Sequence, residues 1–271
     1  MEVKRLRQSC RAILLTFGTG VLITLLLIFI VTPILALLFR ISPDRFCASL
    51  SDPVVWDALV LSLTTATIST CVIVLLGTPV AWINARYCYS GREFVDTIID
   101  LPLVLPPAVA GLALLMAFGR MGIIGRYFYE SGISIAFTTL AVIIAQVFVA
   151  LPFYVRQARA SFEQLDTMYE QAARSLGSTT LPTFFIIVLP LVKSGLIAGA
   201  IMSFARALGE FGATIMFAGN IQGRTQTMPL AIYTTMQGDL NASITLSVIL
   251  IIISFVVLFI VKFKLRRDVR F

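Results

Sequence analysis

The 271-residue sequence contains no histidine, which removes the usual general base, proton shuttle and imidazole metal ligand. Cysteine is scarce as well, and no two of the four cysteines form a C-x-x-C pair. Neither a zinc site nor a disulfide framework is therefore indicated. These absences argue against a hydrolase embedded in the membrane and against a proton pump with a histidine relay. We expect no metal site. The cysteines are Cys10, Cys47, Cys71 and Cys88.

Charge is also scarce, because only 13% of the residues are charged and 58% are hydrophobic. Soluble domains carry about 25% charged and roughly 45–50% apolar residues. The composition therefore predicts an all-α integral membrane protein with a single membrane domain. The net charge of +7 does not indicate nucleic-acid binding here. In a membrane protein the positions of the positive charges matter more than their sum.

The sequence also lacks a nucleotide-binding P-loop. None of its four lysines, which are Lys4, Lys193, Lys262 and Lys264, completes the pattern G-x-x-x-x-G-K-[ST]. We therefore expect no ATPase site and no other catalytic residue on this chain. Any ATP hydrolysis that serves this protein would have to take place on another chain.

Long hydrophobic runs are what the sequence has in place of charge. A membrane core of about 30 Å needs about 20 apolar residues in a helix. Six stretches qualify and predict six transmembrane helices, with the first retained as an anchor because it lacks a signal-peptide cleavage site. The fifth is too long for one perpendicular span, so we expect an entering segment before Pro190, a span and a tail. The stretches are 12–39, 58–85, 98–118, 135–155, 184–217 and 242–261.

The lysines and arginines predict the orientation of these spans. If the amino terminus is cytoplasmic, fifteen of the 21 basic residues fall on the cytoplasmic side and five on the other. Arg206 alone lies within a span. By the positive-inside rule, both termini face the cytoplasm. The five basic residues on the outer side are Arg40, Arg45, Arg120, Arg126 and Arg224.

The longest predicted cytoplasmic segment, 156–183, contains good helix formers on both sides of Asp166. It predicts two short helices exposed to the cytoplasm, and Gly177 is a natural helix stop. The short inward loop near 86–96 is basic. The outward loops near 41–57, 119–134 and 218–241 are moderately polar.

Residues 170–177 read E-Q-A-A-R-S-L-G, and nine residues later the chain reads I-V-L-P at 187–190. This segment resembles the EAA loop of ABC-importer permeases, in which E-A-A and three residues precede a glycine. The resemblance implies that Glu170, Gln171, Ala172, Ala173 and Gly177 belong to a coupling helix that seats in a partner ATPase. Small alanines permit close approach. Gln171 stands where the pattern has its acidic residue, which leaves open whether Glu170 or Gln171 makes the polar contact.

The alternative interpretation of this segment is an ordinary amphipathic connecting helix without a coupling role. Three further stretches favour the family, which is similar to this chain over about residues 58–262. They are 77–82, 101–111 and 204–214, and the last is followed by A-G-N-I at 218–221 and G-R-T-Q-T-M-P-L at 223–230. Together they resemble the molybdate, tungstate and sulfate permeases, and the last resembles the molybdate type in particular.

The resemblance implies a type I ABC-importer permease with three parts. Residues 1–57 hold the tail, first span and outer loop, residues 58–262 form the permease core with coupling loop 156–183, and residues 263–271 form a basic tail. The chain would be a multi-pass protein of a prokaryotic plasma membrane that imports molybdate or tungstate. Its implied partners are a second copy of itself, two ATPase subunits that carry ATP and Mg²⁺, and an external oxyanion-binding protein. Sulfate or thiosulfate is the alternative substrate.

Arg206 and Glu210 are opposite charges within a predicted span, four residues apart, so we expect them to share a helix face and pair. Arg206 could steer the anion near an outer gate. We favour a structural ion pair, because a permease must release its anion. Pro106 and Pro107 either break the third span beside a transport path or merely kink it. Thr214 completes the candidate pathway residues.

Two polar or small-residue patterns also have two readings. A stripe of small residues permits close helix packing or lines a pore, and we favour packing. A hydroxyl-rich second span offers transient bonds to an oxyanion or bonds back to its own carbonyls, and we favour the latter. The stripe is Gly195, Gly199, Ser203 and Ala207, and the hydroxyl residues are Thr64, Thr65, Thr67, Ser69 and Thr70.

A different class, the secondary transporter driven by an ion gradient, predicts acidic or histidine residues deep in the spans. Glu210 is the one candidate, and that class leaves the coupling loop without a role. A membrane enzyme would need clustered catalytic groups, and the sequence shows none.

Overall fold

The computed structural model describes residues 2–41, 44, 46 and 52–268, and within these residues it is helical with no strand. Five of its helices are long and apolar enough to cross a membrane. A sixth crossing is added if one bent helix pair counts as a single span. The all-α prediction is therefore confirmed, and five or six spans agree with the six hydrophobic stretches.

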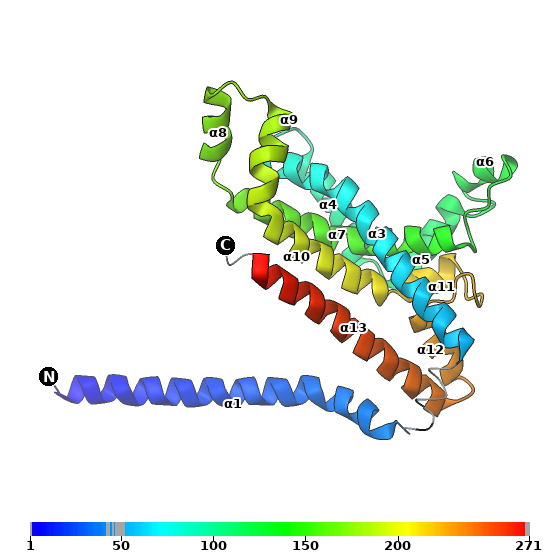
Figure 1. Ribbon diagram of the computed structural model, residues 1–271, viewed down its shortest axis with the longest axis horizontal. Coiled ribbons are helices and arrows are strands. Elements are labelled where there is room, and N and C mark those ends of the chain that lie inside the picture. The colour runs from blue at the N-terminus through cyan, green and yellow to red at the C-terminus, as the bar shows by residue number, and fades with distance from the viewer. Residues whose placement is uncertain (1, 42–43, 45, 47–51, 269–271) are drawn as a thin grey trace.

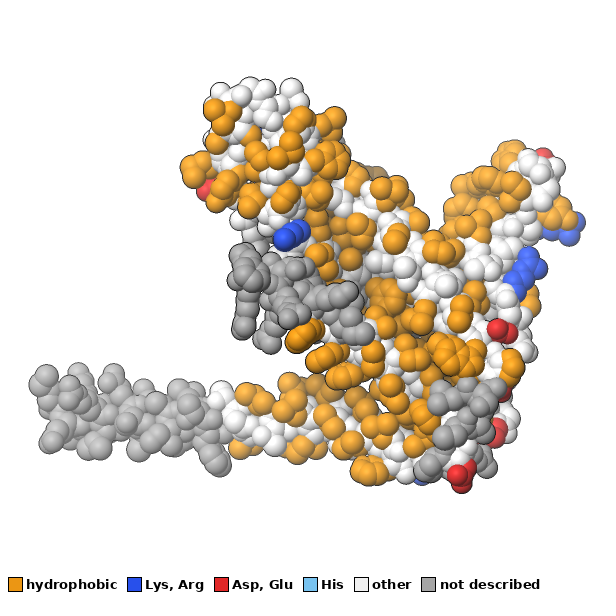
Figure 2. Space-filling view, viewed as in Figure 1, with side chains coloured by type: hydrophobic (Ala, Val, Ile, Leu, Met, Phe, Trp, Pro, Cys, Tyr) orange, Lys and Arg blue, Asp and Glu red, His pale blue; other side chains and the backbone are white. Residues whose placement is uncertain are grey.

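The first helix, α1 (Glu2–Arg40), stands away from the central bundle and contacts α13 (Leu240–Asp268) (Figure 1). None of the apolar window within its span, Thr19–Arg40, is buried. Figure 2 shows hydrophobic side chains along this helix. A large apolar surface of this kind is stable only in lipid or against another chain. The side chains of residues 1–18 lie outside the described residues, so the basic amino-terminal tail stays a prediction.

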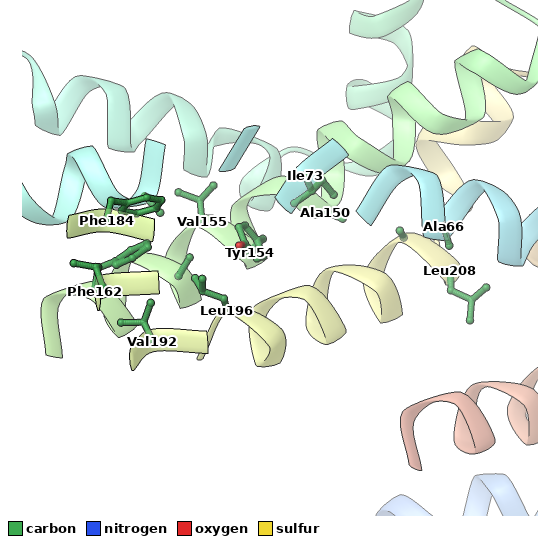
Figure 3. Packing of buried hydrophobic residues seen from close by; sticks show 14 residues of the cluster. Ala66, Ile73, Ala150, Tyr154, Val155, Phe162, Phe184, Val192, Leu196 and Leu208 are labelled. Atoms are coloured by element: carbon green, nitrogen blue, oxygen red, sulfur yellow. The ribbon is translucent and has the colours of Figure 1, made fainter. Parts of the chain in front are cut away.

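The centre of the molecule is built from α3 (Pro53–Arg86), α7 (Thr139–Gln164) and α10 (Leu189–Leu208). The start of α3 is fixed by Asp52, whose carboxylate accepts the amide N–H of Val54 at 2.9 Å. Figure 3 shows how Tyr154 and Phe162 of α7 meet side chains from the other two helices. This cluster is the largest apolar core and holds the bundle together.

The predicted small-residue stripe lets α10 approach α7 within the same chain. A Cβ atom on Gly199 would lie 3.2 Å from the side chains of Tyr154 and Gln157, which is tighter than ordinary contact. The Ser203 hydroxyl donates to the carbonyl of Ala150 at 3.0 Å. The stripe is therefore a helix–helix interface, as favoured from the sequence, and not a pore wall.

The hydroxyls of α3 bond mostly to their own helix. Thr64, Thr67 and Thr70 each donate to the carbonyl four residues earlier at 2.7 Å, which is the reading favoured from the sequence. Ser69 differs, because its hydroxyl donates to the side chain of Gln146 in α7 at 2.9 Å. The amide of Gln146 in turn donates to Thr65, so a buried polar contact ties α3 to α7.

The third predicted span is broken. It consists of α4 (Arg92–Val104) and α5 (Pro107–Phe118), which are bent by 116° relative to each other. Pro106 and Pro107 lack N–H groups and their rings exclude the preceding helical turn, so Leu105 and Pro106 are extended. The two prolines therefore interrupt the span and do not merely kink it. The loop predicted at 86–96 is also shorter, because α4 already begins at Arg92.

The segment before α10 is continuous with it. α9 (Thr180–Thr183) leads into a π-helix, η1 (Phe184–Val188), which leads into α10, so the entering segment expected before Pro190 is helical and continuous with the span. In η1 the wider turn brings the N–H of Leu189 to the carbonyl of Phe184. The tail of the fifth stretch is a separate short helix, α11 (Gly212–Phe217).

Two further helices are short and lie outside the long spans. α6 (Gly125–Glu130) and α12 (Met228–Met236) occupy segments that were predicted as loops. The start of α12 is fixed from α3, because the Met228 N–H donates to the Ser62 hydroxyl at 2.7 Å. The last helix is α13 (Leu240–Asp268). The side chains of Lys262, Lys264, Arg266, Arg267 and Arg270 lie outside the described residues.

Candidate functional site: the α8 helix and the α11 junction

The segment predicted as a coupling loop forms one separate helix, α8 (Met168–Ser175). The predicted helix before Asp166 is not separate, because residues 156–164 are the end of α7. The Asp166 carboxylate accepts the Met168 N–H at 2.9 Å and so fixes the start of α8. Figure 1 shows α8 at one tip of the molecule, beyond the ends of the long helices.

Gly177 ends α8 through its backbone conformation. Its φ is +85°, a left-handed value that glycine adopts without steric cost. The Gly177 N–H donates to the Arg174 carbonyl at 2.9 Å, and the Ser178 N–H donates to the Ala173 carbonyl at 3.0 Å. These two bonds form a Schellman motif, which turns the chain sharply toward α9.

Glu170 faces the membrane helices. Its carboxylate accepts a hydrogen bond from Nε of Arg86, at the end of α3, at 2.7 Å. Both side chains are less than a tenth exposed. Arg86 also donates to the Leu165 carbonyl at 2.9 Å. This buried pair fastens α8 to α3, so Glu170 is occupied within its own chain.

The opposite face of α8 is open. Gln171 and Ala172 are exposed, while Ala173 is buried beneath them. Met168 and Tyr169 are also exposed, and Leu176 at the end of the helix is 89% exposed. A helix that presents small and apolar side chains to its surroundings offers a surface for another protein.

An aromatic cluster lies at η1, the helix that α8 contacts. The ring of Phe184 in η1 lies 4.7 Å from that of Trp82 in α3 and 6.2 Å from that of Phe162 in α7, measured between centroids. The indole N–H of Trp82 is buried and has no hydrogen-bond partner in the described part of the chain. The ends of α3 and α7 therefore meet at η1, which follows the segment that carries α8.

A network of ion pairs lies at the same end of the bundle, and sequence reasoning missed it. Asp96 of α4 accepts from Asn84 at 2.7 Å and also pairs with Arg159 of α7. Arg159 bonds Glu163 at 2.7 Å, and Glu163 also pairs with Arg92 at 3.4 Å. The network joins the ends of α3, α4 and α7. The charges were visible in the sequence, but their partners lie in different helices.

At the opposite end, Arg206 and Glu210 form an ion pair at 2.6 Å between Nη2 and Oε2. They do not share a helix, because α10 ends at Leu208 and Glu210 lies in the break before α11. The other oxygen of Glu210 accepts the Ala213 N–H at 2.8 Å. Glu210 is 1% exposed, so it anchors the start of α11 and holds Arg206 at the end of α10.

Close backbone contact joins α11 to α5. A Cβ atom on Gly111 would lie 2.6 Å from Cβ of Met216 and 2.8 Å from the Ala213 carbonyl oxygen. A Cβ atom on Gly212 would clash with Pro107. We call this meeting point of α5, α11 and the end of α10 the α11 junction. It places Pro107 against Gly212, two residues after Glu210, while Pro106 and Pro107 stay exposed.

Comparison with known proteins identifies the family. Residues 73–269 match the model of the binding-protein-dependent transport system inner membrane component. The chain belongs to this family. It is 44% identical over 220 residues to the molybdenum transport system permease protein ModB of Mycobacterium tuberculosis, covering 81% of this chain and 83% of that one. It is 36% identical over 226 residues to the sulfate transport system permease protein CysT of Salmonella typhimurium, covering 82% and 81%.

A solved structure shows the same fold. A chain of the bacterial alginate ABC transporter, crystallised with an alginate pentasaccharide-bound periplasmic protein, superposes with a TM-score of 0.75 at 16% identity. The match covers 95% of this chain and 96% of that chain. The protein is thus an ABC-transporter permease of the inner membrane.

The remaining predicted site residue of the permease, Thr214, is fully buried in α11. Its hydroxyl has no hydrogen-bond partner within the described residues. Sequence reasoning missed Gln146, whose signal was an amide within an otherwise apolar span. Among the described residues, no group of three or more acidic or cysteine side chains is placed to hold a metal ion.

Proposed function

We propose that this permease is the membrane subunit of an ATP-driven importer that moves molybdate or tungstate into the cell. The observation that carries the proposal is α8, a short helix fastened on one side and open on the other. Its motif residues 170–177 resemble the coupling helix of the family, and its exposed face can receive a partner ATPase.

Coupling would run along two routes from α8. The buried pair between Glu170 and Arg86 connects α8 to α3. The turn at Gly177 leads through α9 and η1 to α10 without a break. Movement of α8 by the ATPase would therefore be transmitted to both helices, and alternating access would follow from their displacement. In this scheme Glu170 positions α8, and Gln171 with Ala172 faces the partner.

Molybdate is proposed because the relative with that transport function is the more similar of the two. The Mycobacterium tuberculosis relative is named for molybdenum transport and shares 44% identity, against 36% for the Salmonella sulfate relative. Sulfate is the second candidate, on the strength of that second relative. Calorimetric titration of the associated binding protein with molybdate, tungstate and sulfate decides between them, and a clear sulfate preference would overturn the first choice.

The assembly would contain two copies of this chain, two ATPase subunits with ATP and Mg²⁺, and an external oxyanion-binding protein. Two identical copies place a pore on their two-fold axis, which is the simplest closed arrangement. Both termini and α8 would face the cytoplasm of a prokaryote. Residues 58–262 would form the permease core, with 1–57 and 263–271 as the flanking parts.

The residues at the α11 junction are proposed to hold a gate and not to bind the anion. Arg206 is already paired with Glu210, and Glu210 also caps α11. The bend after Pro106 and Pro107 lets α5 reach α11. Thr214 lies within this packing, and its hydroxyl has no hydrogen-bond partner among the described residues.

Replacement of Gly177 tests the coupling role. A Cβ atom on Gly177 would meet no atom within 4 Å, so the cost of Gly177→Leu comes from the left-handed backbone, about 1–2 kcal/mol for an L residue. We expect the turn after α8 to relax and uptake per ATP hydrolysed to fall about tenfold or more. The measurement is molybdate uptake and ATP hydrolysis in proteoliposomes that contain the complete transporter.

Gly132→Leu is the matched control. Gly132 has a φ of +83° and also meets nothing within 4 Å, but it lies at the other end of the molecule beyond α6. Its replacement should cost similar stability and leave the ratio of uptake to hydrolysis unchanged. Full coupling in Gly177→Leu, with normal uptake, would contradict the assignment of α8.

A further inference from the structure

The segment 119–134, between α5 and α7, is a built structure although it is too short to span a membrane. Figure 1 shows its helix α6 projecting away from the bundle, near α5 and α11 and far from α8. The chain folds back on the end of α5, because the N–H groups of Ile123 and Ile124 donate to the carbonyls of Met116 and Ala117 at 3.1 and 2.9 Å. A Cβ atom on Gly122 would lie 2.6 Å from the Met116 carbonyl oxygen. We call residues 119–134 the α6 platform.

The surface of the platform is strongly apolar. Figure 2 shows hydrophobic side chains gathered over this projecting end, with basic side chains at its edge. Met121 is 93% exposed and Ile123 is 75% exposed. A contiguous apolar patch of this kind on a short segment marks a contact with lipid or protein. The other large exposed apolar residues of the platform are Ile124, Tyr127, Phe128, Tyr129 and Ile133.

Two arginines of the same platform make cation–π contacts with tyrosine rings. The guanidinium carbon of Arg120 lies 4.1 Å from the centroid of the Tyr129 ring, and that of Arg126 lies 4.7 Å from the Tyr127 ring. Arg126 also donates to the Tyr127 hydroxyl at 2.6 Å. Both arginines are exposed, and neither pairs with a carboxylate in the part of the chain that the structure describes. Their remaining N–H groups are free for an anion of suitable geometry.

We propose that the α6 platform lies in the headgroup layer of the leaflet opposite α8 and binds the phosphate of anionic phospholipids through Arg120 and Arg126. Aromatic side chains with an apolar body and a polar tip gather at membrane interfaces. Guanidinium groups form forked hydrogen bonds with phosphate. The apolar side chains enter the acyl boundary while the two charges remain at phosphate depth. This proposal does not depend on the transported solute or on ATP coupling.

The test places a tryptophan on the platform of the full-length protein in nanodiscs. Ile123→Trp is compared with the unsubstituted protein, and the difference removes the signal of the two native tryptophans, Trp56 and Trp82. Lipids brominated on the acyl chain quench tryptophans that they contact. We expect stronger quenching by brominated phosphatidylglycerol than by brominated phosphatidylcholine when each is a minor component of the bilayer.

Arginine substitutions then show which residues cause the preference for phosphatidylglycerol. Near a membrane surface each arginine contributes about 1 kcal/mol of attraction to anionic lipid, which corresponds to about fivefold in lipid selectivity. Arg120→Gln and Arg126→Gln should each lower the phosphatidylglycerol preference by about that factor. Arg224→Gln, an exposed arginine in another loop, is the control and should leave it unchanged.

Two outcomes would overturn the proposal. Equal quenching by the two lipids would show that the platform does not select anionic headgroups. Absence of quenching by either lipid, with a spectral shift when the oxyanion-binding protein is added, would show that the platform lies in water and docks a protein. Both outcomes are measured with Ile123→Trp alone. A folding defect in an arginine variant therefore cannot prevent the proposal from being disproved.

Discussion

The α8 end and the α11 junction of this permease are held together by different kinds of contact. At the α8 end, long side chains make the connections: Arg86 reaches Glu170, and Phe184 meets Trp82. At the α11 junction, backbones touch, because Gly111 leaves no space for a Cβ atom beside Ala213. Long side chains can follow a neighbouring helix as it moves, whereas close-packed backbones leave little room for displacement. The α8 end is therefore suited to movement and the junction to rigid closure.

The largest effect is expected from Gly111→Val, which tests rigidity at the junction. The new side chain would collide with Met216 and the Ala213 carbonyl, and overpacking together with backbone displacement costs about 3 kcal/mol or more. We expect little folded protein, measured by thermal unfolding in detergent. Gly20→Val is the control, since Gly20 also lies in a helix but meets no atom within 4 Å. Equal stability of the two variants would remove the contrast between the ends.

The next effect is expected from Glu170→Ala at the α8 end. Removing one partner of a buried ion pair costs about 3–5 kcal/mol, and here it leaves Arg86 without its carboxylate. The loss should stay local, so α8 detaches while the bundle remains folded. Hydrogen exchange of residues 168–176 should rise by about 100-fold or more.

Glu163→Ala is the matched control for that experiment. Glu163 also pairs with arginines, but its side chain is 44% exposed. Exposed pairs contribute about 1 kcal/mol or less, so exchange in α8 should hardly change. If global unfolding accompanied Glu170→Ala, the α8 end would be as rigidly integrated as the junction and the comparison would fail.

A smaller effect is expected midway between the two ends, where Gln146 bridges Ser69 and Thr65. Hydrogen bonds between membrane helices contribute on average about 0.6 kcal/mol, with a maximum near 1.7 kcal/mol. Gln146→Leu should therefore lower stability by about 1 kcal/mol. Thr67→Val removes a bond to its own helix and should cost only a few tenths of that, by the same unfolding assay. A larger loss in Thr67→Val would contradict this ranking.

The smallest effect is expected from Arg156→Gln. Arg156 forms a bidentate pair with Asp100, but its side chain is 61% exposed. We expect a loss of about 0.5 kcal/mol that disappears in 1 M salt, because exposed pairs are weak and screened. Salt-dependent unfolding measures it. A loss of stability that persisted at high salt would show that this pair is shielded from solvent, as the buried pair of Glu170 is.

Sequence reasoning predicted the spans and α8 well, because both depend on local composition. Twenty apolar residues need no partner to indicate a membrane helix, and a motif such as 170–177 specifies its own turn at Gly177. It did not decide whether Pro106 kinks or breaks its helix. That outcome depends on α11, which accepts the displaced α5 only because Gly111 and Gly212 lack side chains.

The partner of Glu170 could not be predicted from the sequence either. The motif left open whether Glu170 or Gln171 faces outward, because this depends on which side of α8 rests on α3. Only the position of Arg86, 84 residues earlier, settles it. The pairing of Arg206 with Glu210 was foreseen from their spacing, yet their shared helix was not formed, since Glu210 bonds better to the start of α11.

The π-helix at Phe184–Val188 has a consequence for the phase of the chain. In an uninterrupted α-helix each step of four residues drifts by about 40° around the axis, so Phe184 and Leu196 would face directions about 120° apart. Both are buried in one cluster, because the wider turn takes up an extra residue and compensates for the drift. That single turn therefore changes the direction that the residues before it face around the helix axis. Without it, the preceding turn of the same helix, Thr180–Thr183, would face a different direction around the axis.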